Sequence, residues 1–145
     1  MQTKTKMAEG TKRKKWEEQI LKLGFRTWKS IKIPDAPMTG NKICDSILDN
    51  GQTFYLEWKD LDVSKTVNYF NPKSIFRPHQ IRELNEIEDM SLRNYKCAFG
   101  MCGKKISNRI HIYIIPAKAL KQDRIYLKDY EAYSLEGAVK FFCPR

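Results

Sequence analysis

Ile43-Cys-Asp-Ser-Ile-Leu-Asp-Asn-Gly-Gln-Thr-Phe-Tyr-Leu-Glu-Trp-Lys59 is the stretch of sequence that decides the fold. It consists of an apolar run, the turn signal Asp49-Asn50-Gly51, and strict alternation of polar and apolar residues from Thr53 to Lys59. Apolar segments on both sides of an Asn-Gly turn are typical of a β-hairpin. Because side chains alternate faces along a strand, Glu57 and Lys59 share one face of the second strand, and its large apolar residues share the other.

The length of the hairpin loop decides whether Asp45 joins Glu57. A two-residue Asn50-Gly51 turn would place Asp45 on the face opposite to Glu57. A loop of odd length, formed by residues 49–51 with the glycine in the left-handed position of a bulge, would place Asp45 opposite Tyr55 and diagonal to Glu57. We predict the odd loop, because only this loop brings the two carboxylates together.

Two carboxylates on one face form an all-oxygen site for a hard divalent cation, Mg²⁺ or Mn²⁺, which keeps waters for a substrate phosphate. A neighbouring lysine can orient or deprotonate the attacking water, or offset charge that develops on the phosphate. Asp45, Glu57 and Lys59 therefore fit the Asp, Glu-x-Lys signature of the PD-(D/E)xK nucleases. A ladder of ion pairs on the surface of a strand is the alternative interpretation of the same residues.

The composition indicates a partner that is a polyanion. The chain has 145 residues with 27 Lys and Arg against 17 Asp and Glu, a formal net charge of +10, so nucleic acid is the first expected partner and an anionic membrane surface the second. The length fits one domain. No apolar run is long enough to span a membrane, and the Lys-rich start lacks the apolar segment of a signal peptide, so we expect a soluble, cytoplasmic protein. The four cysteines form no Cys-x-x-Cys pair and predict reduced thiols rather than a zinc site.

The hydrophobic pattern predicts a helix, three strands, a helix and two strands in chain order. Residues 1–15 are polar and Lys-rich and are predicted to form a basic flexible arm, which leaves residues 16–145 as a single domain. The predicted elements are a helix over 16–24, a strand over 25–33, the hairpin, an irregular segment over 60–71, a helix from Pro78, strands over 95–101 and 109–115 with a basic turn at 103–105, a short helix over 117–122, a strand near 124–128 and a helical turn from Ser134.

Further polar residues near these elements are candidates for the same site. Glu17 and Glu18 lie in the first turn of the first helix, where the helix dipole favours acids, and one of them could act as an outer metal ligand. Gln80 lies in the first turn of the helix from Pro78, where its amide could reach a phosphate or a metal-bound water. The candidates for contact with DNA are the basic residues Lys65, Lys73, Arg77, Lys104 and Lys105, for which a solvated loop or turn is the alternative.

The predicted order of elements is that of the restriction-endonuclease-like core, an α/β (α+β) fold with a mixed sheet. From about Gly10 to Glu136 the chain resembles the RecU-type Holliday junction resolvases. The matching motifs are Trp16-Glu17 with Ile20, Ile31-Lys32-Ile33-Pro34 followed by Pro37, the residue Asp45, Glu57-x-Lys59, and Phe70-x-x-Lys73-x-Ile75 leading to His79-Gln80-Ile81.

The resemblance implies a metal-dependent endonuclease that acts on double-stranded or four-way branched DNA. It implies that Asp45, Glu57 and Glu17 bind Mg²⁺ or Mn²⁺, and that Lys59 and Gln80 complete the catalytic site. A four-way junction is two-fold symmetric and needs paired incisions, so a homodimer is the expected assembly. The small size fits a bacterial, phage or other mobile-element origin.

One departure from the family concerns selectivity for junctions. RecU-type proteins carry a long stalk between the proline-containing strand and the metal-binding Asp, whereas only residues 38–44 separate Pro37 from Asp45 here. Two alternatives to a junction resolvase stay open. One is a nuclease that acts on flaps, ends or linear duplex, and the other is a non-enzymatic basic DNA-binding protein.

Overall fold

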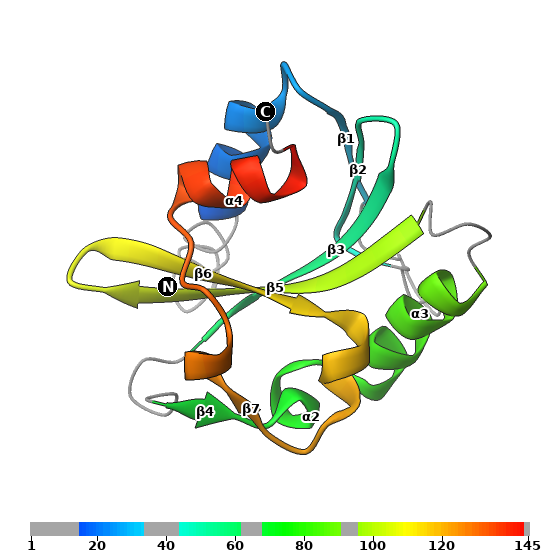
Figure 1. The fold of residues 1–145 in the computed structure, drawn as a ribbon, viewed down its shortest axis with the longest axis vertical. Helices are drawn as coiled ribbons and strands as arrows, with labels where there is room; N and C mark the ends of the chain where they lie inside the picture. The colour runs from blue at the N-terminus through cyan, green and yellow to red at the C-terminus, as the bar shows by residue number, and fades with distance from the viewer. Residues whose placement is uncertain (1–14, 34–43, 62–67, 91–95, 144–145) are drawn as a thin grey trace, which may run out of the picture.

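A five-stranded mixed sheet forms the centre of the molecule (Figure 1). The computed structural model describes residues 15–33, 44–61, 68–90 and 96–143. The strand order is β1-β2-β3-β5-β6; β3 and β5 are parallel and the other neighbours are antiparallel. The strands are β1 (Lys29–Lys32), β2 (Ser46–Asp49), β3 (Thr53–Asp60), β5 (Lys96–Ile106) and β6 (Arg109–Pro116). The predicted fold class, an α/β fold with a mixed sheet, is confirmed.

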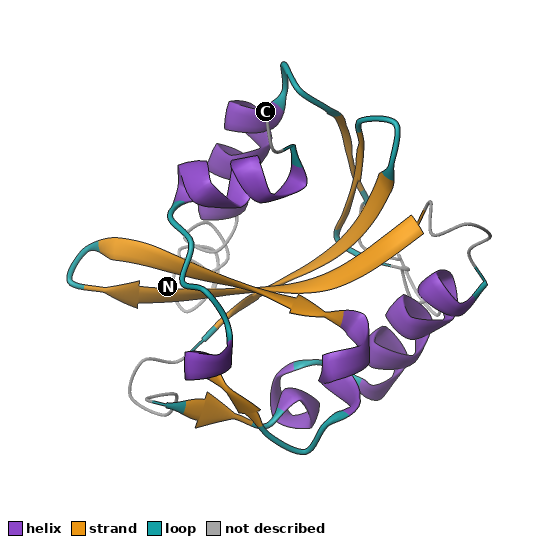
Figure 2. Ribbon diagram, in the orientation of Figure 1, coloured by secondary structure: helices purple, strands orange, loops and turns teal. Residues whose placement is uncertain are grey.

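Helices cover both faces of the sheet (Figure 2). The helix over residues 15–24 and α4 (Leu135–Phe142) lie on one face, where their apolar residues pack with the apolar side of β3. The short helix α2 (Pro72–Ile75), α3 (Pro78–Asp89) and the 3₁₀ helix η2 (Ala117–Lys121) lie on the other face. Glu57 and Lys59 point toward this second face, which we call the α3 side.

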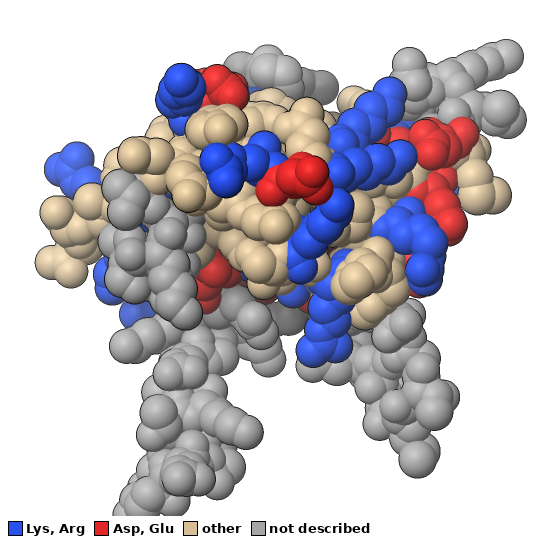
Figure 3. Space-filling model, turned by 90° about the horizontal axis from the view of Figure 1, so that it is seen from below, with Lys and Arg blue, Asp and Glu red and all other residues tan. Residues whose placement is uncertain are grey.

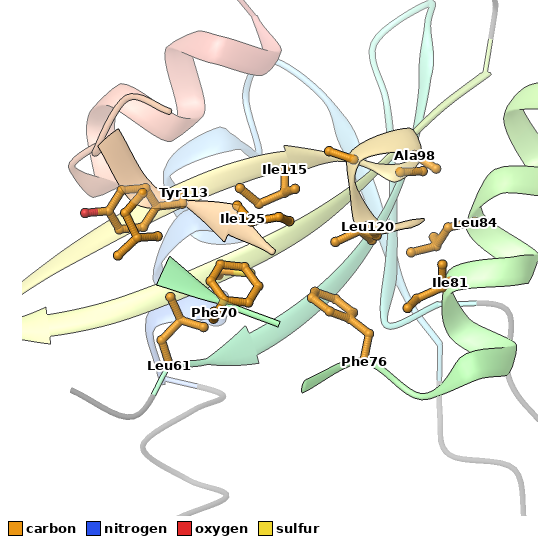
Figure 4. Packing of buried hydrophobic residues seen from close by; sticks show 14 of the residues in the cluster. Leu61, Phe70, Phe76, Ile81, Leu84, Ala98, Tyr113, Ile115, Leu120 and Ile125 are labelled. Atoms are coloured by element: carbon orange, nitrogen blue, oxygen red, sulfur yellow. The ribbon is translucent and has the colours of Figure 1, made fainter. Parts of the chain in front are cut away.

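The core on the α3 side has two ends (Figure 4). Phe76 and Ile81 lie at one end, near the start of α3, and Tyr113 lies at the other. Phe70 and Ile125 lie between them and come from a small two-stranded sheet, in which β4 (Tyr69–Phe70) pairs antiparallel with β7 (Ile125–Tyr126). The 3₁₀ helix η3 (Leu127–Asp129) follows β7.

The β2–β3 hairpin has a loop of odd length, as predicted, but the loop is shifted by one residue. Asp49 pairs with Thr53, so the loop consists of residues 50–52, and Gly51 has a φ of +107°. The Asp49 carboxylate accepts the N–H of Gly51 at 2.9 Å. This bond satisfies a loop amide that strand pairing leaves without a partner, and it favours the shifted loop.

The shift changes the position of Asp45 relative to β3. Tyr55 pairs with Ile47, so the predicted pairing of Asp45 with Tyr55 is wrong. Continuing the observed register by one pair brings Asp45 level with Glu57, and the Asp45 N–H donates to the carbonyl oxygen of Leu56 at 2.9 Å. Both carboxylates still lie on one face, because the loop is odd.

Several other predicted elements have different bounds. The segment predicted to be irregular over 60–71 contains the last residue of β3 and the strand β4, and the strand predicted near 124–128 is reduced to β7, which η3 follows. The turn predicted at 103–105 is part of β5, and the chain reverses at Ser107 and Asn108, whose φ angles are 50° and 65°. Two consecutive positive φ angles give the type I′ geometry, whose twist matches a hairpin. The strand predicted over 25–33 is shortened to β1, because residues 25–27 form a turn in which the backbone N–H groups of Thr27 and Trp28 donate to the carbonyl oxygen of Gly24 at 2.8 Å and 3.0 Å.

The remaining predicted helices are present. Pro78 occupies the first turn of α3, and the 3₁₀ helix η2 occupies most of the predicted 117–122 segment. Ser134 caps α4, with its hydroxyl accepting the N–H of Gly137 at 3.0 Å. The predicted basic arm, apart from Lys15, lies outside the described residues. None of the helices in the described part of the chain is long and apolar enough to cross a membrane.

Candidate active site

Glu57 is the centre of a group of polar side chains on the α3 side of the sheet. Its side chain is buried, at 2% exposure, on a strand that lies between two others. The Gln80 side-chain amide donates to Glu57 Oε1 at 2.7 Å, and Lys59 Nζ lies 3.8 Å from the same oxygen. The structure therefore brings together Glu57, Lys59 and Gln80, which the sequence pattern predicted for one site.

Gln80 links the start of α3 to Glu57. Its Oε1 accepts the backbone N–H of Arg77 at 2.9 Å, while its Nε2 donates to the Glu57 carboxylate. Because an amide oxygen only accepts and an amide nitrogen only donates, the two bonds define which end of the side chain faces Glu57. The first turn of α3 is thereby held against β3, and the Glu57 carboxylate is held in one orientation.

Asp45 lies immediately before β2 and is half-buried. Its Oδ2 accepts the backbone N–H of Trp58 at 2.9 Å, so its carboxylate lies beside the backbone that carries Glu57. The Cys44 thiol is close enough to both acids to respond to their charges. Burial raises the pKa of Cys44 to about 12, with smaller upward contributions from Glu57 and Asp45. The Cys44 thiol donates to the carbonyl oxygen of Ser46 at 3.3 Å.

The donor set fits a hard divalent cation. Asp45 and Glu57 supply carboxylate oxygens, the ligand type that Mg²⁺ and Mn²⁺ prefer in proteins. Among the residues that the structure describes, no three His, Cys, Asp or Glu side chains are grouped as a metal cage. Two carboxylates without a complete cage leave coordination positions for water and a substrate phosphate.

Glu17 is buried, at 4% exposure, on the helix over residues 15–24. The neighbouring Trp16 packs on Trp58, with ring centroids 5.3 Å apart, and donates its indole N–H to Asp60 at 2.7 Å. This helix covers the face of the sheet opposite to α3. Glu17 forms no three-acid group with Asp45 and Glu57, so its part in metal binding stays a prediction.

The five predicted DNA-contact residues lie in different surroundings. Lys105 is exposed on β5 and Arg77 is exposed at the start of α3. Lys73 is exposed and lies 2.9 Å from the Asp123 carboxylate. Lys104 is buried, at 6% exposure, so it is not on a surface turn as predicted. Lys65 lies outside the described residues.

Phe76 is a member of the site that the sequence pattern did not indicate. The Lys59 ammonium lies 5.8 Å from the centroid of the Phe76 ring, and the ring itself is almost fully buried. Phe76 occupies the link between α2 and α3, where the chain has neither a helical nor a strand period. The motif Phe70-x-x-Lys73-x-Ile75, which directly precedes Phe76, indicated this segment of the chain but did not include Phe76 itself.

Basic side chains are prominent on the side of the molecule that carries α2, β4 and β7. Figure 3 views the molecule from below, and Lys and Arg side chains form an oblique band across this face, with acidic side chains in smaller groups beside it. A band of positive charge attracts the phosphates of a nucleic acid from a distance and orients it on the surface.

No protein-family model and no curated protein sequence matches this chain. A solved structure of Hjc, a Holliday junction resolvase from the archaeal hyperthermophile Archaeoglobus fulgidus, matches with a TM-score of 0.57 and 11% sequence identity. The match covers 82% of this chain and 94% of that chain. The similarity confirms the restriction-endonuclease-like fold that the order of elements predicted.

Proposed function

We propose that this chain is a metal-dependent, structure-selective DNA endonuclease that resolves four-way (Holliday) junctions by paired symmetric nicks. The observation that carries the proposal is the buried Glu57 carboxylate, which contacts Gln80 and lies beside Lys59, with Asp45 level with it on the neighbouring segment. The net charge of +10 and a restriction-endonuclease-like fold shared with a Holliday junction resolvase support DNA as the substrate.

Each residue of the site has a role that follows from its surroundings. Asp45 and Glu57 would hold Mg²⁺ or Mn²⁺, which when bound polarises a phosphate and lowers the pKa of a coordinated water. Lys59, with a side chain that is 17% exposed, is placed to orient the attacking water or to offset charge on the phosphate. Gln80 positions the Glu57 carboxylate. In hydrolysis the water oxygen bonds to phosphorus and one phosphorus–oxygen ester bond breaks, which leaves a phosphate and a hydroxyl at the nick.

The symmetry of the substrate suggests the assembly. A four-way junction presents two equivalent strands, so two copies of this chain related by a two-fold axis would place one site at each strand. Glu17 is proposed as an outer ligand in each copy on the resemblance to RecU-type resolvases alone, because its helix packs on the other face of the sheet. Lys65, Arg77 and Lys105 are proposed as contacts to DNA phosphates.

A nuclease without junction selectivity is the second candidate. It is favoured by the short segment 38–44, which stands where RecU-type proteins carry the stalk. Such an enzyme would use the same residues on flaps, ends or linear duplex.

The deciding experiment compares two substrates for wild type and Glu57→Gln. An end-labelled immobile four-way junction and a linear duplex built from the same arms are incubated with Mg²⁺, with Mn²⁺ or with EDTA. We expect paired symmetric nicks on the junction alone, lost in EDTA and lost in Glu57→Gln. DNA binding by Glu57→Gln should be unchanged or tighter, because removing a negative charge reduces repulsion of the phosphate.

The other outcomes are distinct. Equal cutting of junction and duplex would support nuclease activity and reject selectivity for four-way junctions. Tight, salt-sensitive binding with no cutting in any metal would favour a non-enzymatic DNA-binding protein. Loss of binding together with cutting in a folded Glu57→Gln variant would reject the site.

A further inference from the structure

A cavity on the α3 side, away from the candidate active site, is lined by aromatic and basic residues. It has a volume of about 510 Å³. It lies beside the last residues of β5, beyond Gly103, where the pairing of β5 with β3 ends. None of the described residues that line it is acidic. The lining includes two lysines, three tyrosines and an amide: Lys104, Lys128, Tyr113, Tyr126, Tyr130 and Asn68. We call this cavity the tyrosine cleft.

An exposed aromatic pair continues from the cleft along the β4–β7 sheet. Tyr126 and Tyr69 are 40% and 45% exposed, and their ring centroids are 5.9 Å apart. The Arg124 guanidinium lies 4.3 Å from the Tyr69 ring centroid, and the Lys128 ammonium lies 5.8 Å from the Tyr126 ring centroid. The two tyrosines are cross-strand partners in the β4–β7 sheet and lie outside the core cluster on this side, so their rings contact each other and a cation at each end and stay exposed to a ligand.

The tyrosine cleft is separate from the candidate active site but lies on the same face of β5. Gly100 pairs with Glu57, and Lys104 is four residues further along the strand, which corresponds to about 13 Å. Figure 4 shows Tyr113 at one end of the core, with its hydroxyl pointing away from the packed side chains, and Phe76 at the other end. About 13 Å is roughly four nucleotides at the rise of a duplex strand.

We propose that the tyrosine cleft binds an unpaired nucleotide of the DNA substrate, a few nucleotides from the cleaved phosphate, with its base stacked on Tyr126 and its phosphate paired with Lys128. The choice of DNA as ligand rests on the proposed function, but the binding does not require cleavage. The cleft would select DNA whose strands have come apart, as at a branch point or a flap.

The chemistry of the lining suits an unpaired nucleotide. Stacking of a base on an aromatic ring requires that the base leave its duplex, and it tolerates any sequence because every base has a π-face. Burial raises the pKa of Tyr113 and of Tyr130, so both phenols keep their protons and can donate to a phosphate or a base edge. Lys104 lines the wall of the cleft and is buried, at 6% exposure, so Lys128 is the cation assigned to the phosphate.

Binding is tested in EDTA, so that no cleavage contributes. Fluorescence anisotropy measures the affinity of a labelled thymidine 12-mer and of a labelled duplex for wild type, Tyr126→Leu and Lys128→Gln. Tyr126→Leu should weaken binding of the 12-mer by about 5- to 100-fold, the range for loss of one stacked base, and change duplex binding less than about twofold. Two exposed residues outside the cleft provide matched controls, Phe25→Leu and Lys121→Gln.

A crosslink locates the contact. Illumination of a complex with a 5-iodouracil-substituted 12-mer should attach the base to Tyr126 or Tyr130, as mapped by mass spectrometry. An equal loss of 12-mer and duplex binding, no loss in either folded variant, or crosslinks only outside the cleft would overturn the proposal. A chain that cuts no DNA can still pass this test, and an active nuclease can fail it, so the two proposals are judged separately.

Discussion

At the scale of single residues, the contact between Glu57 and Gln80 is central. A buried carboxylate is unfavourable unless hydrogen bonds and nearby positive charge offset its desolvation. Gln80 supplies a hydrogen bond at 2.7 Å and Lys59 supplies a charge at 3.8 Å. The same two side chains therefore stabilise the folded state and hold the Glu57 carboxylate in the orientation in which it is proposed to bind a metal ion.

Gln80→Met tests this dual role. Methionine is close to glutamine in length but can neither donate to Glu57 nor accept the Arg77 N–H, so we expect the free energy of unfolding to fall by about 1–3 kcal/mol. The cleavage rate should fall with it, because the Glu57 carboxylate is no longer held in one orientation. Urea unfolding and junction cleavage measure the two effects.

Arg82→Gln, an exposed change in the same helix, is the control for Gln80→Met and should leave both stability and cleavage near wild type. If Gln80→Met cleaves as fast as wild type at saturating metal, Gln80 stabilises the fold but does not position the site.

At the scale of elements, β5 connects the two sides of the molecule. Its residues alternate between the core beneath α3 and the core beneath α4, and its length carries the chain from the candidate active site to the tyrosine cleft. At Gly100, which pairs with Glu57, the strand is approached closely by the Phe76 ring.

Gly100→Ala tests this approach. An added Cβ would lie 2.7 Å from Phe76 and 3.3 Å from Leu120, so the ring must move. Because Phe76 is buried, we expect a loss of about 1–3 kcal/mol in the free energy of unfolding, as for other overpacked cores. The displaced ring would also shift Lys59 and slow cleavage. Thermal unfolding and single-turnover cleavage are the measurements.

Gly137→Ala in α4 is the matched control for Gly100→Ala. Its nearest contact would be 3.2 Å, at the Ser134 hydroxyl, and alanine favours a helix over glycine by about 1 kcal/mol. It should therefore change stability by less than Gly100→Ala and leave cleavage unchanged. A wild-type cleavage rate in Gly100→Ala would show that the position of Phe76 does not affect Lys59.

At the scale of the whole molecule, we expect the charge of +10 to govern the proposed DNA binding. The salt slope is the slope of a plot of the logarithm of the binding constant against the logarithm of the salt concentration. Each lysine that neutralises a DNA phosphate makes this slope steeper by about 0.9. The exposed Lys105 is a candidate for such a contact, whereas the Lys73 charge is offset by Asp123 at 2.9 Å.

Lys105→Gln should therefore reduce the salt slope for duplex binding by about 0.9, and Lys73→Gln should reduce it by less. Anisotropy titrations at several salt concentrations in EDTA give both slopes. Equal slopes for Lys105→Gln and wild type would remove Lys105 from the DNA contacts.

The sequence by itself determined the order of the elements and which residues share a face. Alternation places Glu57 and Lys59 on one face of β3 in any strand order or register. A hairpin loop with an odd number of residues keeps Asp45 on the same face. Pro78 and Ser134 marked the starts of two helices, because proline and serine are favoured at those positions for local reasons.

Only the tertiary structure decided the contacts between segments that are distant in the chain. The one-residue shift of the hairpin loop depends on side-chain hydrogen bonds to loop amides, and the continuation of β5 through Lys104 depends on its pairing with β6. The contact of Gln80 with Glu57, the position of Phe76 beside Lys59 and the tyrosine cleft all join residues more than fifteen positions apart. Periodicity reports which face a residue occupies, but packing decides which distant residue it meets.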